Sequence, residues 1–397
     1  MPLNSTLVEQ LAVTVNRENL SHRLAEMVRI FSINPFASAA REGYREDELA
    51  SYLLEQFKAL GLETGKFEVA PGRPNIWGTL KGKGTGPSLV LGAHMDTVSI
   101  ENYENALEPA IKEGRLYGRG ACDMKAAFAA YLELTRLLIE NEVELSGDLH
   151  IVGLIDEEYK MMGSQTYPSH GPKAEFGIIG EPTNLKICPA HRGQLGFLIT
   201  AHGKAAHSSR KELGRNAIRQ MMPVLDMLED FDKDLQGREP HPLCGYASVS
   251  PNVIQGGTVA SIVPDKCTLE VDIRTLPGTS ANDIKNELAR RLEKLENTLP
   301  DAKFDLTGPS WDIPGLEVDT HSPIITALAE SHQSLFGEKP MLEAFPAATD
   351  APYMGFPTVI CGPGNLEQAH STNEFVDLSQ VEDATKLYLG CLLALKM

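Results

Sequence analysis

Hydrophobic positions along the chain recur with two periods, one typical of helices and one typical of strands. Amphipathic helical patterns cover residues 19–31 and 44–60, and Gly61 ends the second one. The run 88–93 is apolar throughout, which predicts a strand buried on both faces. In the same half of the chain the pattern predicts strands near Glu68 and at 75–80, 149–155 and 176–180, and helices at 124–140 and 163–167. Strands that alternate with helices in this way indicate an α/β layer fold.

The order of the predicted elements changes after Gly193. From there the pattern predicts strands at 194–202, 246–255, 267–274 and 304–306, with helices at 216–230 and 281–295. This β-α-β-β-α-β order is the ferredoxin-like signature. We therefore expect an inserted α+β domain, residues 193–305, within a discontinuous α/β domain of residues 1–192 and 306–397 that has helices around a mixed sheet. An apolar helix at 378–395 is expected near the end of the chain.

Composition narrows the class of protein. A chain of 397 residues with 42% apolar residues favours two domains with sizeable cores. The net charge of −18 disfavours nucleic acid as a partner, because binding needs basic side chains that displace phosphate counterions. The six cysteines show no C-x-x-C pairing, and neither a signal peptide nor a membrane-spanning run is evident. We expect a soluble, cytoplasmic protein that has no membrane partner.

A histidine and a carboxylate follow the apolar run 88–93. In Gly-Ala-His-Met-Asp-Thr, His94 and Asp96 are two residues apart and share one face of an extended chain. Asp96 can therefore reach the ring of His94, as a carboxylate does when it fixes the tautomer of a metal-bound histidine. Taken alone, the pair favours a structural hydrogen bond over a metal site.

Other carboxylates stand at the ends of predicted elements. Asp123 opens the long helix near residue 124, where it could be an N-cap, a ligand shared by two cations, or both. Asp156, Glu157 and Glu158 end the strand 149–155. Because three adjacent carboxylates repel one another, they indicate either a solvated strand end or a nearby cation.

Two further residues complete a candidate metal site. Glu181 follows the strand 176–180 in Gly-Glu-Pro-Thr, and His370 lies in Gln-Ala-His-Ser-Thr after a Gly-Pro-Gly turn; each alone is typical of a polar loop residue. Open α/β sheets gather their sites at strand ends, and two imidazoles with three carboxylates suit zinc, cobalt or manganese. The candidate ligands are His94, Asp123, Glu158, Glu181 and His370.

Several motifs, in order along the chain, resemble the metallopeptidase family that includes acetylornithine deacetylase, succinyl-diaminopimelate desuccinylase, aminoacylase and carboxypeptidase G. They are His-Met-Asp-Thr-Val, Gly-Arg-Gly-Ala-Cys-Asp-Met-Lys, Asp-Glu-Glu, Gly-Glu-Pro-Thr, Gly-Lys-Ala-Ala-His-Ser-Ser, Asp-Ile-Arg and Gln-Ala-His. The resemblance implies a zinc-peptidase-like catalytic domain, an inserted lid or dimerisation domain, and two divalent metal ions. Zinc is the first choice for these ions, with cobalt or manganese as alternatives.

The resemblance also implies how the ligands are shared. One ion would take His94, Asp123 and Glu181, and the other would take Asp123, Glu158 and His370. Asp123 would then bridge the two ions.

Four more residues receive roles from the resemblance. Asp96 would orient His94, and Glu157 would be the general base that activates a water. His207 lies in the inserted domain, so it would reach the site from a closing lid or from a neighbouring subunit. It resembles a family histidine that is supplied across a homodimer and stabilises the oxyanion, with an ordinary strand-end histidine as the alternative. Arg274 resembles an arginine that binds a substrate carboxylate, with a surface salt bridge as the alternative.

The expected activity is hydrolysis of the amide bond of a small N-acyl amino acid, closest in motifs to acetylornithine deacetylase. A succinyl-diaminopimelate desuccinylase, or a broad N-acyl-amino-acid hydrolase or exopeptidase, is the alternative with the same chemistry. A metal-dependent binding protein without catalysis is a third hypothesis, which the presence of Glu157 disfavours. Serine-hydrolase and single-zinc protease motifs are absent from the sequence.

Overall fold

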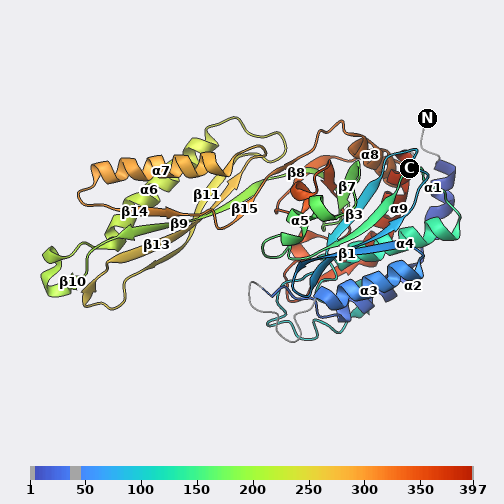
Figure 1. Ribbon diagram of the computed structural model, residues 1–397, viewed down its shortest axis with the longest axis horizontal. Helices are drawn as coiled ribbons and strands as arrows, with labels where there is room; N and C mark the ends of the chain where they lie inside the picture. The colour runs from blue at the N-terminus through green and yellow to red at the C-terminus, as the bar shows by residue number, and fades with distance from the viewer. Residues whose placement is uncertain (1–4, 36–45, 396–397) are drawn as a thin grey trace. The chain divides into compact units, whose positions relative to one another are not determined.

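The computed structural model describes residues 5–35 and 46–395, and the chain separates into two compact units (Figure 1). The first unit comprises Met1–Pro189, Val318–Phe345 and Thr349–Met397, and the second comprises Ala190–Glu317 with Pro346–Ala348. The predicted start of a helix at Tyr44 lies outside the described residues, and the helix itself, α3, is described from Glu46.

A mixed sheet forms the centre of the first unit, with strands in the order β1-β2-β6-β3-β7-β18-β8. The strand β3 pairs in parallel with both β6 and β7. Every residue of β3 and β6 is buried, as is typical of parallel strands that are covered on both faces. The bounds of the strands in sheet order are Glu63–Ala70, Arg73–Leu80, Leu149–Leu154, Leu89–His94, Phe176–Ile179, Thr358–Ile360 and Ile187–His191. A separate small sheet, in the order β19-β5-β4, comprises Phe375–Asp377, Arg115–Tyr117 and Ala110–Lys112.

Helices pack against this sheet and against one another. The helix α4 contacts β3 and also packs against α2 and α9, whereas α3 and α5 contact β1 and β2. The sequence sets several helix ends, since the Asn16 side chain caps α2 and Gly61, with φ +75°, follows the end of α3. The helices α1 to α5, α8 and α9 are Ser5–Ala12, Arg17–Arg29, Glu46–Ala59, Lys125–Glu140, Met162–His170, Pro323–Phe336 and Leu378–Ala394.

The second unit has an antiparallel sheet in the order β11-β13-β9-β14, with the helices α6 and α7. The first strand in the chain lies beside the last and the third, which is the ferredoxin-like order. The four strands in sheet order are Ser248–Gly256, Lys266–Thr275, Gly193–His202 and Phe304–Thr307, and the helices are Ala217–Gln236 and Ala281–Thr298. The short strands β10, β12, β15 and β16 are Ala206–His207, Ile262–Val263, Asp312–Ile313 and Leu316–Glu317.

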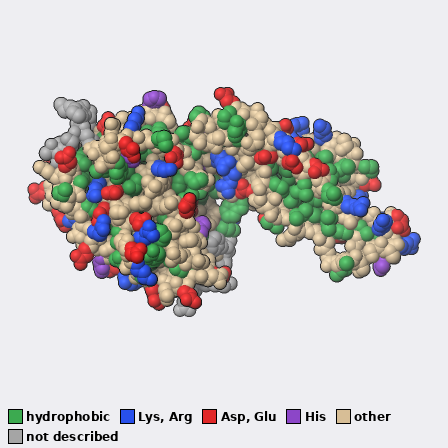
Figure 2. All heavy atoms as spheres, turned by 180° about the vertical axis from the view of Figure 1, so that it is seen from behind, with side chains coloured by type: hydrophobic (Ala, Val, Ile, Leu, Met, Phe, Trp, Pro, Cys, Tyr) green, Lys and Arg blue, Asp and Glu red, His purple; other side chains and the backbone are tan. Residues whose placement is uncertain are grey.

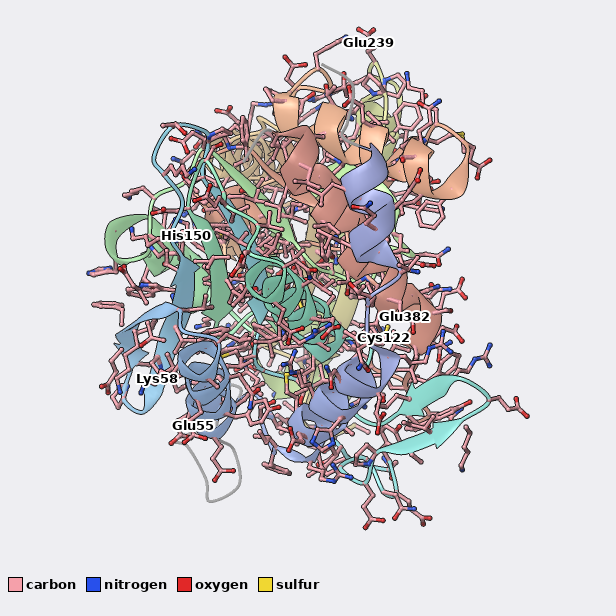
Figure 3. The ribbon with its side chains drawn as sticks, turned by 90° about the vertical axis from the view of Figure 1, so that its right-hand side faces the viewer. Glu55, Lys58, Cys122, His150, Glu239 and Glu382 are labelled. Carbon is pink, nitrogen blue, oxygen red and sulfur yellow. The ribbon has the colours of Figure 1, made fainter. Side chains whose placement is uncertain are left out.

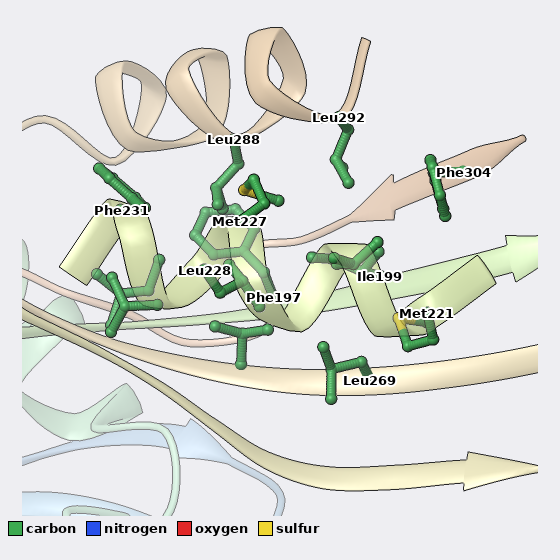
Figure 4. Packing of buried hydrophobic residues seen from close by; sticks show 14 of the residues in the cluster. Phe197, Ile199, Met221, Met227, Leu228, Phe231, Leu269, Leu288, Leu292 and Phe304 are labelled. Atoms are coloured by element: carbon green, nitrogen blue, oxygen red, sulfur yellow. The ribbon is translucent and has the colours of Figure 1, made fainter. Parts of the chain in front are cut away.

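One face of this sheet and the two helices share a core (Figure 4). Alternate residues of β9, among them Phe197 and Ile199, are buried together with Leu269 of β13, as the two-residue period of a strand requires. Leu228 of α6 and Leu288 of α7 belong to the same cluster. The second unit therefore has a hydrophobic core of its own.

The predicted fold class is confirmed, with helices around a mixed sheet and a ferredoxin-like α+β unit. The buried strands and long helices match their predicted bounds to within a few residues, whereas the short strands β4, β5, β8, β10 and β12 were missed. No helix in the described part of the chain is long and apolar enough to span a bilayer. Acidic and basic side chains are interspersed over the face of the first unit seen in Figure 2.

Candidate metal centre

Three predicted ligands lie at the carboxyl ends of neighbouring strands. The strands β6, β3 and β7 are parallel and adjacent, so their carboxyl ends share one edge of the sheet. His94 is the last residue of β3, while Glu158 follows β6 and Glu181 follows β7. This edge is where α/β sheets place their sites.

Asp123 lies between two histidines in this cluster. Its Oδ1 is 3.0 Å from Nε2 of His94, and its Oδ2 is 3.4 Å from Nε2 of His370. The Nε2 atom of His370 is also 3.0 Å from Oε2 of Glu158, and that of His94 is 4.0 Å from Oε1 of Glu181. The structure therefore brings together all five residues that the sequence singles out as candidate ligands.

The chemistry of the cluster fits divalent cations. Oε1 of Glu158 and Oε1 of Glu181 are buried and accept no hydrogen bond from any residue that the structure describes. Burial raises the pKa of Glu158 to about 7 and that of Glu181 well above its usual range. The carboxylates of Asp123 and Glu158 raise the pKa of His370 to about 10, which reflects a strongly negative potential. Imidazole and carboxylate groups in such surroundings suit zinc and related ions.

Asp123 comes from a glycine-rich loop in front of α4. The helix begins at Lys125 and its N-cap is Met124, which makes no side-chain cap, so the interpretation of Asp123 as an N-cap is wrong. The adjacent Cys122, labelled in Figure 3, is buried, and its thiol donates to the carbonyl oxygen of Asn365 (3.3 Å). The Asp123 carboxylate is thus directed to the histidines rather than to the helix.

The carboxylate of Asp96 organises the turn after β6 more closely than it contacts His94. The Nδ1 atom of His94 lies 2.9 Å from the backbone oxygen of Asp96 and 3.7 Å from its carboxylate. The carboxylate accepts the backbone N–H groups of Glu157 (3.2 Å) and Glu158 (3.0 Å) and the side-chain amide of Asn34 (2.7 Å). Asp96 therefore fixes both glutamates through their backbone.

Asp156 has a positive partner of its own, Arg73. Its Oδ1 accepts hydrogen bonds from Nη2 of Arg73 (2.8 Å) and from the side chain of Asn34 (3.0 Å). Arg73 also pairs with the buried Glu46, whose Oε1 accepts the backbone N–H of Asp156 (3.0 Å). Asp156 has φ +68°, a left-handed conformation that is strained for a non-glycine residue and that turns the chain sharply before Glu157.

Glu157 lies in the same turn, beside the candidate ligands. Burial raises the pKa of Glu157 well above its usual range, and the negative charges of Glu181 and Glu158 act in the same direction. Its carboxyl group is therefore held where a proton binds readily, and a cation nearby would oppose this effect.

Asn34, Arg73, Glu46 and Asp350 were missed by sequence reasoning. Asp350 is fully buried just before the short helix η2 (Ala351–Tyr353), and burial raises its pKa to about 7. It adds a further carboxyl group to the negative potential around the cluster. None of these four residues lies in a motif that marks it in the sequence, so only their tertiary contacts reveal them.

His207 and Arg274, the remaining predicted residues, belong to the second unit. His207 is exposed at the end of β10, and its Nδ1 is 2.8 Å from the hydroxyl of Ser209. Arg274, near the end of β13, donates from Nε to Oδ1 of Asp272 (2.9 Å), and Asp272 also accepts from the side chain of Gln194 (2.6 Å). The arginine is therefore held in place while its side chain remains 31% exposed.

Comparison with known proteins gives consistent matches over most of the chain. A family model described as Peptidase family M20/M25/M40 matches residues 90–394. Acetylornithine deacetylase of Proteus mirabilis is 31% identical over 377 residues, which cover 91% of this chain and 94% of that protein. N-formyl-4-amino-5-aminomethyl-2-methylpyrimidine deformylase of Bacillus subtilis is 30% identical and covers 87% of this chain and 88% of its own.

A solved structure shows the same fold. The crystal structure of a dinuclear metal-binding peptidase from Bacillus subtilis superposes with a TM-score of 0.69 at 19% identity. The alignment covers 96% of this chain and 99% of that one. At this level of identity the likeness establishes the fold alone.

The ion pairs of Arg73 with Glu46 and Asp156 predict that removal of the arginine strongly lowers the stability of the first unit. Arg73→Met should lower the free energy of unfolding of the first unit by about 3–5 kcal/mol, because Glu46 and Asp156 would remain buried without their cation. Lys83→Met, which breaks an exposed pair with Glu144, should cost less than about 1 kcal/mol. Urea unfolding at neutral pH, followed by circular dichroism, measures both; equal effects would contradict the structural role of Arg73.

Proposed function

Because the chain belongs to the peptidase family M20/M25/M40, whose members include deacetylases, we propose that it hydrolyses the amide bond of a small N-acyl amino acid with two bound divalent metal ions. The resemblance inferred from its motifs is confirmed, and the chain is a metal-dependent amide hydrolase. The observation that carries the proposal is the convergence of two histidines and three carboxylates at one sheet edge.

In this proposal Asp123 is shared between two metal positions. His94 and Glu181 complete the first position, and Glu158 and His370 complete the second. A pair of divalent ions would polarise the amide carbonyl and lower the pKa of a water bound between them. Zinc suits this set of nitrogen and oxygen ligands best, with cobalt or manganese as alternatives.

Glu157 is the proposed general base. Its carboxylate accepts a proton from the attacking water and then passes this proton to the nitrogen of the leaving amine. Glu158, the next residue, is a ligand in this scheme, so the Asp96 carboxylate, which holds the backbone of both, sets the two glutamates in their different roles. This arrangement disfavours the third hypothesis, a binding protein without catalysis.

The second unit contributes substrate contacts and a dimer interface in our proposal. His207 would donate to the developing oxyanion from the partner subunit, and Arg274 would bind the substrate carboxylate. Strand β11 is at the edge of its sheet, and beside it lies a hollow of about 540 Å³ lined by Ile218, Val259 and Ile262, which are 40%, 56% and 43% exposed. An edge strand beside exposed apolar side chains is suited to a two-fold interface.

The substrate we favour is an acetylated amino acid of amino-acid biosynthesis, in the cytoplasm. The similarity to acetylornithine deacetylase supports the acyl group, and the six cysteines, all free thiols, are consistent with a reducing compartment. A desuccinylase or a broad N-acyl hydrolase or exopeptidase remains the alternative, which the peptidase family and the deformylase relative support.

A panel of N-acetyl, N-succinyl and N-formyl amino acids and dipeptides tests this function. The zinc- or cobalt-loaded protein should release the amine fastest from acetylated substrates, and chelation should abolish turnover until metal is restored. Preference for a succinylated substrate would replace the acetyl assignment. Turnover indifferent to chelator would overturn the metal mechanism.

Glu157→Gln should lower kcat by about 10²–10⁴-fold, because the amide cannot accept the proton from water. The metal content should stay at the level of the unaltered protein, since Glu157 is not a ligand in our scheme. Elemental analysis beside steady-state kinetics separates these effects. Loss of metal together with loss of rate would assign Glu157 to the ligands instead.

His207→Ala should impair turnover more than metal content, and mixing tests whether the histidine acts across a dimer. When inactive His207→Ala and Glu157→Ala proteins are unfolded, combined and refolded, about a quarter of the sites should regain an intact set of residues if each site borrows His207 from its partner. Each variant refolded alone is the control. Absence of recovered activity in verified mixed dimers would place His207 in the same subunit as the site that it serves.

A further inference from the structure

The loop that carries Asp123 wraps around one buried carboxylate, that of Glu374. Oε1 of Glu374 accepts the backbone N–H groups of Cys122 (2.8 Å) and Asp123 (3.0 Å). Oε2 accepts the N–H of Gly120 (3.0 Å) and Nη1 of Arg119 (2.7 Å). Both oxygens are thus satisfied, and the Glu374 side chain is fully buried. Successive backbone N–H groups that converge on an anion form a nest, and here the anion belongs to the same chain.

The backbone of Glu374 extends the same contact. Its carbonyl oxygen accepts the N–H of Gly118 (3.0 Å) and the hydroxyl of Tyr103 (3.2 Å). One residue therefore receives six hydrogen bonds, and five of them come from residues 118–123.

Two positions in this loop require glycine for steric reasons. Gly120 has φ +78°, and a Cβ there would lie 2.9 Å from Cγ2 of Thr97. Gly118 has φ +146°, and a Cβ there would lie 2.4 Å from Cγ1 of Val28. The Gly-Arg-Gly sequence can therefore close around a carboxylate where other residues would be strained or would clash.

Glu374 also belongs to the segment that carries His370, four residues earlier in the chain. His370 has φ +61° and a side chain that is 57% exposed, so packing restrains it little. The Glu374 contact joins this segment to the Asp123 loop, and the two loops together supply two of the three ligands of the second proposed metal position.

We propose that Glu374 is a positioning residue that clamps the Asp123 loop to the His370 segment and so preforms the metal centre. This inference rests on the proposed function, in which both residues bind metal. The position shared by Asp123, Glu158 and His370 depends on the clamp through two ligands, whereas the position of His94 and Glu181 depends on it through Asp123 alone. Loss of the clamp should therefore weaken the former position more.

Glu374→Gln tests the clamp. The amide nitrogen of glutamine is itself a donor, so it cannot accept the N–H groups that now donate to one oxygen of the Glu374 carboxylate. Zinc titration by calorimetry should show about a 10–100-fold loss of affinity at the position of Asp123, Glu158 and His370, which is the size expected when a residue that holds metal ligands is removed. The loss at the position of His94 and Glu181 should be smaller. Glu133→Gln is the matched control, since Glu133 is equally buried and accepts from Arg136 (2.6 Å) and from the N–H of Asn16 (2.8 Å), but on α4 away from the site. It should lower thermal stability and leave both affinities unchanged.

A second measurement needs no metal. In the metal-free protein, amide hydrogen exchange of residues 118–123 should accelerate in Glu374→Gln and stay unchanged in Glu133→Gln. If Glu374→Gln does not fold, Glu374→Asp, whose shorter side chain cannot span the nest, replaces it in both measurements. Unchanged exchange would overturn the clamp, and equal loss at both metal positions would overturn its selective role. Unaltered protein that binds no metal would instead contradict the proposed function, while hydrogen exchange still decides whether the clamp exists.

Discussion

The structure of the first unit depends on how it balances negative charge at one buried sheet edge. Parallel strands bring carboxylates to this edge from segments far apart in the sequence, and burial removes the water that would otherwise stabilise their charge. A protein can compensate such charges with arginine, with backbone N–H groups or with bound cations. Arginine and backbone N–H groups compensate one set of carboxylates here, and bound cations would compensate another.

The outer carboxylates are compensated by the protein itself. Asp156 and Glu46 share Arg73, and Glu374 pairs with Arg119 and the N–H groups of a glycine-rich loop. These pairs fix the backbone of the turns that carry Glu158 and Asp123. The inner carboxylates have histidines as partners, and buried oxygen atoms of Glu158 and Glu181 accept no hydrogen bond from the residues that the structure describes, so bound metal ions would supply the compensation that they need.

This division connects stability with function. In the proposed metal centre, outer groups that are paired with arginine hold the inner candidate ligands in place, and the inner groups would provide the affinity for metal. Asp156 has its positive φ angle in the turn that Arg73 holds, and His370 has its positive φ angle in the segment that Glu374 joins to the Asp123 loop. The second unit folds around its own core, so the apolar residues on its surface are available for association.

The sequence by itself determined the α/β character, the ferredoxin-like order, the family and the five candidate ligands. These features depend on local periodicity and on residue types directly after apolar strands, both of which one chain displays. Only the tertiary structure decided which groups hold those candidate ligands in place. The side chains of Glu374, Arg73 and Asn34 act through contacts with residues between 27 and 255 positions away, and Asp96 proved to hold a turn rather than mainly the ring of His94. Such long-range hydrogen bonds leave no periodic trace in the sequence, because they arise only when the sheet has brought distant loops together.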